Sequence, residues 1–163
     1  MVSTFAGSGT ASSGNGIGKT AQFNYPSGVA VDSSGNVYVG DSVNHRIRKI
    51  TPAEVVSTFV GTGSAGHADG TGNTAQFGTP LGVAVDSSDN VFVADFINHR
   101  IREITPEGVV STLAGTDTEG FADGIGTEAQ FNYPSEWLWT QRTMSMWQML
   151  TITASGKSLL REW

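Results

Sequence analysis

One group of polar side chains occurs twice in this sequence, in the same order and at the same spacing. The residues are Asp41, Asn44, His45 and Arg46 in the first copy and Asp95, Asn98, His99 and Arg100 in the second. Aspartate and histidine together could hold a metal ion or carry out acid–base catalysis. The repetition favours a structural role, because an active site needs different residues that converge on one point.

Two glycine-rich stretches resemble nucleotide-binding loops. "GNGIGKT" at Gly14–Thr20 has the lysine and threonine of a phosphate loop, but Ser13 stands where that motif needs glycine. "GTGSAG" at Gly61–Gly66 fits a dinucleotide-binding pattern, but "HADGTGN" follows it where a helix is required. Both stretches are interpreted as connections between repeated units, and no cofactor is expected.

Few other residues could bind metal or transfer protons. His67 lies on a glycine-rich loop, which is typical of solvated surface. The Asp–Gly pairs at Asp69 and Asp123 lack the alternating carboxylates of a calcium loop and predict turns. His67, Asp117 and Glu119 remain as non-repeated candidates, and we expect neither a metal site nor a catalytic residue.

All of these motifs lie within a 54-residue repeat. "VSTFAG", "VSTFVG" and "VSTLAG" begin at Val2, Val56 and Val110. Residues 2–55 and 56–109 are identical at 34 of 54 positions without a gap. Such self-similarity is the sequence signature of a repeat architecture.

Each repeat predicts four short β-strands. Apolar runs such as "GVAVD" and "VFVAD" are separated by turn residues such as "SSGN" and "TPEG". The continuous apolar runs favour sheets that are covered on both faces. The predicted strands are 28–32, 36–41, 46–51 and 55–60, then 82–86, 90–95, 100–105 and 109–114. Residues 2–7 predict a lone fourth strand whose own blade is missing.

A repeated four-stranded sheet of this size fits a blade of a β-propeller, in which about 4–8 blades close a ring; a stacked solenoid is the alternative. The pattern "P.GVAVDSSGNVYV.D..NHRIRKIT" closely resembles the NHL repeat over residues 2 to about 135. The resemblance implies a propeller that serves mostly as a binding platform. It also implies that the eight repeated polar residues hold the turn between the second and third strands and bridge strands by hydrogen bonds.

The predicted fold class is therefore all-β: a partial β-propeller with about two complete four-stranded antiparallel blades and a C-terminal tail unlike the blades. The expected segments are an orphan outer strand with a glycine-rich loop (1–27), a blade (28–60), a loop (61–81), a second blade (82–114), a loop (115–135) and the tail (136–163). Both ends are interpreted as cuts in a longer repeat array. Two blades cannot close a ring, and their uncovered apolar faces favour self-association or completion by a protein partner.

Composition limits the remaining partners. The formal net charge of −6 and the pI near 4.8 argue against nucleic acid, although Arg46, Arg48, Arg100 and Arg102 could cluster locally. The sequence has no cysteine and no membrane-spanning apolar run. The start "MVSTFAGSGT" does not resemble a signal peptide, so a cytoplasmic location is expected by default.

The expected function is that of a non-catalytic binding or scaffold module. Some relatives of the NHL family are lyases or lactonase-like hydrolases that hold a metal in the central funnel. The alternative is therefore a fragment of such a metal-dependent propeller enzyme, with its active-site residues on blades that this chain lacks.

The tail carries all four tryptophans of the chain, although a third copy of "GVAVD" is due at residue 136. A reading frame displaced by one nucleotide explains this. Methionine and tryptophan have single codons, and "MSMW" at residues 144–147 read in that frame permits "VYV" at the position that the repeat requires. Over residues 136–163 the displaced frame permits "GVAVDSADNVYVADADNHRIRKVTPEGV". We interpret the tail as a third blade translated out of frame, with no site on its tryptophans.

This interpretation predicts the nucleotide sequence. Sequencing the gene across the codon of Ser135 should reveal a further "GVAVD…NHRIRK" repeat one nucleotide out of frame, continuing beyond the codon of Trp163. A displaced frame that encodes no such repeat contradicts the interpretation.

Overall fold

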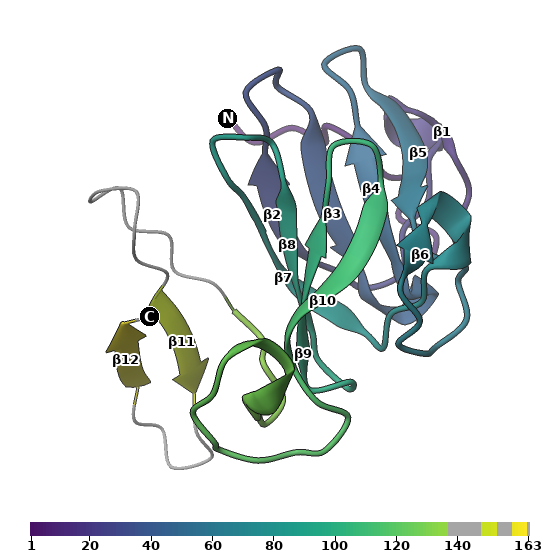
Figure 1. Cartoon of the computed structure of the whole chain (residues 1–163). Helices are drawn as coiled ribbons and strands as arrows, with labels where there is room; N and C mark the ends of the chain where they lie inside the picture. Colours follow the sequence, from purple (N-terminus) through teal and green to yellow (C-terminus); the bar gives the residue numbers. More distant parts are fainter. Residues whose placement is uncertain (137–147, 153–157, 163) are drawn as a thin grey trace.

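The computed structural model describes residues 1–136, 148–152 and 158–162. Two five-stranded antiparallel sheets pack against each other, with the second in front of the first in Figure 1. We call them blade 1 and blade 2. Blade 1 has the order β1-β5-β4-β3-β2 and blade 2 the order β6-β10-β9-β8-β7. The described fold is therefore all-β, as the repeat predicts.

The four long strands of each blade lie close to their predicted positions. Blade 1 contains β2 (Pro26–Val31), β3 (Val37–Asp41), β4 (Arg46–Ile50) and β5 (Val55–Val60). Blade 2 contains β7 (Pro80–Val85), β8 (Val91–Asp95), β9 (Arg100–Ile104) and β10 (Val109–Gly115). The first strand of each blade begins two residues before its predicted start, at a proline that occupies the first strand position, where no ladder donor is needed.

Each blade has a short fifth strand that the sequence does not predict. β1 (Gly16–Ile17) pairs with the outer edge of β5, and β6 (Gly70–Thr71) pairs with β10. Short 3-10 helices follow them, η1 (Gly18–Thr20) and η3 (Gly72–Thr74), and η4 (Gly126–Glu128) lies in the connection after blade 2. The phosphate-loop-like stretch is therefore a strand edge and a tight turn.

The predicted strand at residues 2–7 is absent from the structure, which corrects that expectation. Residues 1–5 are exposed and extended without a strand partner. Backbone hydrogen bonds first attach this segment at Gly7, whose N–H donates to the Gly18 carbonyl. A strand needs a neighbouring ladder, and the edge strands of blade 1, β1 and β2, do not pair with residues 2–7.

The apolar core lies between the two blades. From blade 1 it receives Tyr38, Ile47 and Val60, and from blade 2 and the connection before it the core receives Ala75, Phe77, Val83, Val91, Val93, Ile104 and Val110. Tyr38 is 2% exposed and Phe77 is fully buried. The continuous apolar runs of the inner strands are explained by this packing of sheet on sheet.

The inner strands β2 and β7 run side by side, on the left side of the two blades in Figure 1. Gly28 permits the close approach, because a Cβ atom there would lie 2.5 Å from the Val83 nitrogen and 2.9 Å from the Gly82 carbonyl carbon. The Ser27 hydroxyl donates to the Leu81 carbonyl at 3.0 Å. Close backbone contact, together with this hydroxyl bond, therefore sets the spacing of the blades at this edge.

The described part of the tail forms a separate two-stranded antiparallel sheet. Its strands are β11 (Gln148–Ile152) and β12 (Ser158–Glu162). The four tryptophans lie outside the described residues. No helix among the described residues is long and apolar enough to cross a membrane.

Replacement of Gly28 by alanine tests the close approach. Gly28→Ala should lower the free energy of unfolding by about 1–3 kcal/mol, since the added methyl meets backbone that cannot move aside. Gly14→Ala is the matched control, because its methyl would meet only the flexible end of Gln22. Urea unfolding followed by circular dichroism measures both; equal stability of the two variants would contradict the packing described.

Candidate functional site

Asp41, at the end of β3, is the centre of the repeated polar constellation in blade 1. It is fully buried. One carboxylate oxygen accepts a hydrogen bond from the Asn24 N–H at 2.7 Å. The other accepts from Asn44 Nδ2 at 2.8 Å and from Arg48 Nη1 at 2.9 Å. The carboxylate thus joins the chain before β2, the turn after β3 and the middle of β4.

Asp95 repeats this arrangement in blade 2. It accepts from the Gly78 N–H at 2.6 Å, from Asn98 Nδ2 at 2.8 Å and from Arg102 Nη1 at 2.9 Å. Burial raises the pKa of Asp95, while the hydrogen bonds from Asn98 and Gly78 and the charge of Arg102 act in the opposite direction. Because both oxygens already accept hydrogen bonds, the group is poorly placed to act as a general base.

Arg48 and Arg102 belong to the site, although sequence reasoning considered them only as part of a basic patch. Both side chains are fully buried in ion pairs with the aspartates. Arg48 also donates to the Gln22 and Gly14 carbonyls and to Asn15 Oδ1, at 2.9, 3.2 and 2.8 Å. The available signal was an arginine directly after a buried isoleucine in both copies of "RIR".

The two repeated histidines link each blade to the next repeat. His45 Nδ1 accepts a hydrogen bond from the Thr79 N–H at 3.2 Å, and His99 Nδ1 accepts from the Tyr133 N–H at 3.2 Å. Both histidines have left-handed backbone angles, with φ of 52° and 53°, as the turn after the aspartate requires. Nδ1 of each histidine is therefore occupied by a backbone N–H of the next repeat.

The repeated asparagines and the first arginine of each copy bind the connecting loops. Asn44 Nδ2 donates to the Ser12 carbonyl, and Asn98 Nδ2 donates to the Gly66 carbonyl. Arg46 Nη2 donates to the Thr62 carbonyl at 3.1 Å. Arg100 forms an ion pair with Asp117 at 2.7 Å. The structure therefore places the eight repeated residues at two equivalent turns and does not bring them together.

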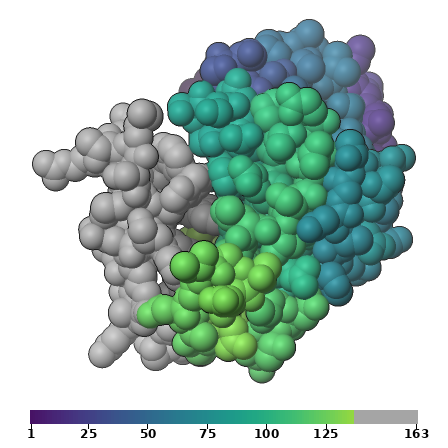
Figure 2. Space-filling view, viewed as in Figure 1, coloured from purple at the N-terminus to yellow at the C-terminus, as the bar shows by residue number. Residues whose placement is uncertain are grey.

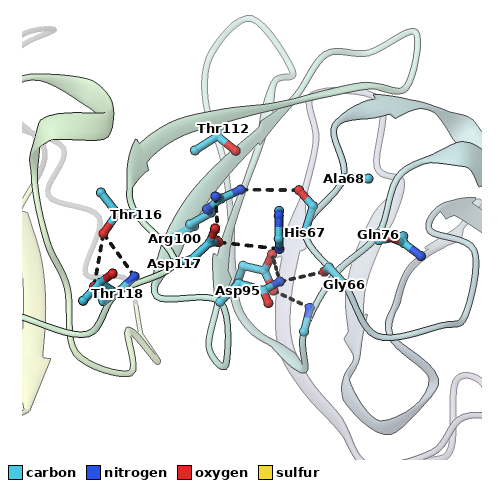
Figure 3. A network of polar contacts seen from close by, with 12 residues as sticks. Gly66, His67, Ala68, Gln76, Asp95, Arg100, Thr112, Thr116, Asp117 and Thr118 are labelled. Atoms are coloured by element: carbon cyan, nitrogen blue, oxygen red, sulfur yellow. Dashed lines mark hydrogen bonds and ion pairs between the residues drawn. The ribbon is translucent and has the colours of Figure 1, made fainter.

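One cluster of non-repeated groups lies beside Arg100 (Figure 3). His67 Nδ1 is 3.5 Å from Asp117 Oδ1, and about half of each side chain is exposed. Arg100 binds the same carboxylate oxygen and donates to the His67 carbonyl at 3.5 Å. Two of the three non-repeated candidates from the sequence are thus neighbours, while Glu119 is exposed.

Asp69 forms a contact that its Asp–Gly turn motif does not predict. Its carboxylate accepts from Arg102 Nη2 at 2.6 Å and from the Thr112 hydroxyl at 3.1 Å. It stands where blade 1 has Asn15 bound to Arg48. Within the described residues, no three histidine or acidic side chains are grouped as a metal site would require.

A cavity of about 450 Å³ opens at the inner strands. Its described lining residues are Ser27, Gly28, Val29, Leu81, Gly82, Val83, Ser135 and Glu136. Glu136 is the single ionisable side chain among them, so this lining offers no pair of acid and base.

Comparison with known proteins identifies the repeat. The family model described as "NHL repeat" matches residues 23–50 and 77–104, which contain the aspartate–arginine pairs and the histidine turns of both blades. The chain contains two NHL repeats. Each NHL repeat match runs from the end of one connection to the third strand of the blade.

The chain is similar to parts of longer proteins. Protein SUPPRESSOR OF QUENCHING 1, chloroplastic, of Arabidopsis thaliana is 40% identical over 91 residues, which are 55% of this chain and 9% of that protein. NHL repeat-containing protein 2 of Homo sapiens is 34% identical over 145 residues, 80% of this chain and 20% of that protein. The chain therefore spans at most a fifth of either relative.

Solved structures show the same fold. A structural genomics protein of unknown function from Bacteroides thetaiotaomicron superposes with a TM-score of 0.67 at 30% identity, over 78% of this chain and 32% of its own.

Similar proteins also include enzymes. Peptidyl-glycine alpha-amidating monooxygenase of Mus musculus is 31% identical over 69% of this chain and 11% of its own length. A gluconolactonase from Xanthomonas campestris shares the fold alone, at 14% identity and a TM-score of 0.55.

Removal of one buried arginine tests the ion pair in the NHL repeat. Arg48→Met should lower the free energy of unfolding by about 3–5 kcal/mol, because the Asp41 charge stays buried without its partner. Lys19→Met, which removes an exposed charge, should change it by less than about 1 kcal/mol. Urea unfolding provides the measurement, and a loss below about 1 kcal/mol for Arg48→Met would contradict the role assigned to the pair.

Proposed function

We propose that this chain is a non-catalytic binding module that acts by associating with a protein. The observation that carries the proposal is the use of the repeated polar groups. The carboxylates, amides, guanidinium groups and imidazole Nδ1 atoms of both constellations bind other groups of the same chain. These residues hold the blades in place, as the turn geometry supports, and they are not available to a substrate.

Catalysis needs several side chains that converge on one point and whose donor or acceptor atoms are not already used in other contacts. A general base must reach the proton that it removes, and a metal site needs several converging ligands. The aspartates are buried, and each histidine presents its Nδ1 to a backbone N–H of the next repeat. The two constellations therefore support construction of the blades and not chemistry.

The same geometry argues against nucleic acid as the partner. Phosphate binding needs arginines that reach solvent. Arg48 and Arg102 are fully buried against their aspartates, which leaves Arg46 and Arg100 partly exposed on separate blades. With a net charge of −6, the chain offers a protein partner a better match than a polyanion.

A second candidate is a part of a propeller enzyme, and the His67–Asp117 contact favours it. The two residues are not repeated, come from two different connections and lie partly exposed. Against this role, Asp117 is bound more closely by Arg100, at 2.7 Å, than by His67, at 3.5 Å. An aspartate that is neutralised by arginine does little to strengthen histidine as a base.

Metal titration separates the two functions. Isothermal titration calorimetry of the purified chain with Zn²⁺ and with Ca²⁺ should show no stoichiometric binding. One-to-one binding that weakens at least tenfold in His67→Ala and in Asp117→Ala, but not in the control Glu119→Ala, would overturn the binding-module proposal in favour of the enzyme.

A further inference from the structure

The face of blade 1 that points away from blade 2 is an unfinished copy of the seam between the blades. Residues that are 54 positions apart occupy equivalent places, so their burial can be compared. Val83 is 8% exposed, whereas its counterpart Val29 is 59% exposed. Val85 is partly buried against the core, whereas its counterpart Val31 is 58% exposed.

The apolar core on this face is half built. It contains Ala21, Val39, Ile50 and Val56, with Ala6, Phe23 and Val37 packed against them. These residues correspond to those that the second repeat, with β5, contributes to the complete seam. The missing half corresponds to Tyr38 and Ile47, which the second and third strands of a preceding blade would supply.

A backbone donor on this face also lacks its acceptor. The N–H of Thr79 and the N–H of Tyr133 each bind the histidine of the preceding blade. Tyr25 is the equivalent residue, has the same left-handed conformation with φ of 54°, and is 77% exposed. Its N–H has no partner among the described residues, although it is equivalent in the repeat to the two N–H groups that donate to a histidine Nδ1.

Residues 2–7 have the sequence of the outer strand of a blade that would precede blade 1. "VSTF" at residues 2–5 is identical to residues 56–59 of β5, which pairs with β4 in the register Ile50 to Val56 and Arg48 to Thr58. In β5, Phe59 packs against Tyr38 with ring centroids 5.1 Å apart. Phe5, its counterpart, is 45% exposed. The segment therefore has the sequence of an outer strand, and none of the described residues forms three inner strands beside it.

We propose that this face, together with residues 2–7, binds the three inner strands of another NHL-type blade supplied by a partner protein. These three strands of the partner, which we call the partner meander, present an aromatic side chain at the Tyr38 position and isoleucine at the Ile47 position. They also present a histidine that accepts from the Tyr25 N–H. Its third strand pairs with residues 2–7, which become its fourth. This inference rests on the binding-module function and names the partner and the surface.

The partner is a blade without its own outer strand, and a folded second copy of this chain does not meet that condition. In both blades described, the third strand is already paired with β5 or β10. The Nδ1 atom of His99 likewise already accepts a hydrogen bond from the Tyr133 N–H. A second copy would have to release both contacts before its blade could dock.

The probe is a polypeptide with residues 80–109 of this sequence, which contains three inner strands, Phe92 and His99. It should bind the full chain, and hydrogen exchange at residues 2–7 and at Tyr25 should slow at least tenfold in the complex. Val29→Asp with Val31→Asp in the chain should abolish binding, because the two carboxylates would lie in the apolar contact. The free protein should still fold, since both side chains are exposed in it. His99→Ala in the probe should weaken binding about fivefold, the loss of one hydrogen bond.

A covalent fusion of the probe to the chain tests the same contact without depending on the affinity of the separate probe. Residues 80–109 fused directly before Val2 place the meander where the repeat puts it, and the fusion should protect residues 2–7 unless Val29 and Val31 are replaced by aspartate. Absence of protection in the fusion overturns the proposal. Concentration-dependent dimers of the chain alone that Val29→Asp removes also overturn it, in favour of self-association. Neither result bears on metal binding, so the binding-module function is tested separately.

Discussion

The buried ion pair between aspartate and arginine is the interaction on which the rest of the structure depends. Asp41 with Arg48, and Asp95 with Arg102, are fully buried and 2.9 Å apart. Two buried charges are tolerable only when their remaining hydrogen-bonding capacity is satisfied. Each arginine therefore also binds carbonyls of the preceding connection, and each aspartate binds a backbone N–H before the inner strand. One pair thus fixes a turn, two strands and a loop within each blade.

The links between blades follow from the same turn. Because the aspartate holds the turn after the second strand, histidine takes a left-handed conformation there and its ring reaches the next repeat. Three contacts then hold one blade to the next. They are the hydrogen bond of the histidine, the apolar packing between the sheets and the close backbone approach at Gly28. In Figure 2 the second blade covers the first in one continuous surface. A module built in this way is suited to adding blades, and its repeated polar residues bind other groups of the same chain.

Much of this arrangement could be predicted from the sequence, and particular residues show where prediction ended. The 54-residue period predicted the long strands β2 to β5 and β7 to β10. The short strands β1 and β6 were missed, since two residues rich in glycine and threonine carry no periodic pattern. Residues 2–7 were predicted as a strand from their identity with β5, but a strand needs a ladder partner that local sequence does not provide.

The sequence by itself determined the repeat, the fold class and the identity of the polar residues, because strand and turn preferences act over a few neighbouring residues and recur with the period. The tertiary structure alone decided what those residues contact. Arg48 and Arg102 were equally compatible with a basic surface until packing enclosed them with their aspartates. The neighbourhood of His67 and Asp117 likewise depends on two connections that meet only after both blades are formed. Burial and long-range pairing are properties of the packed chain, so local sequence does not specify them.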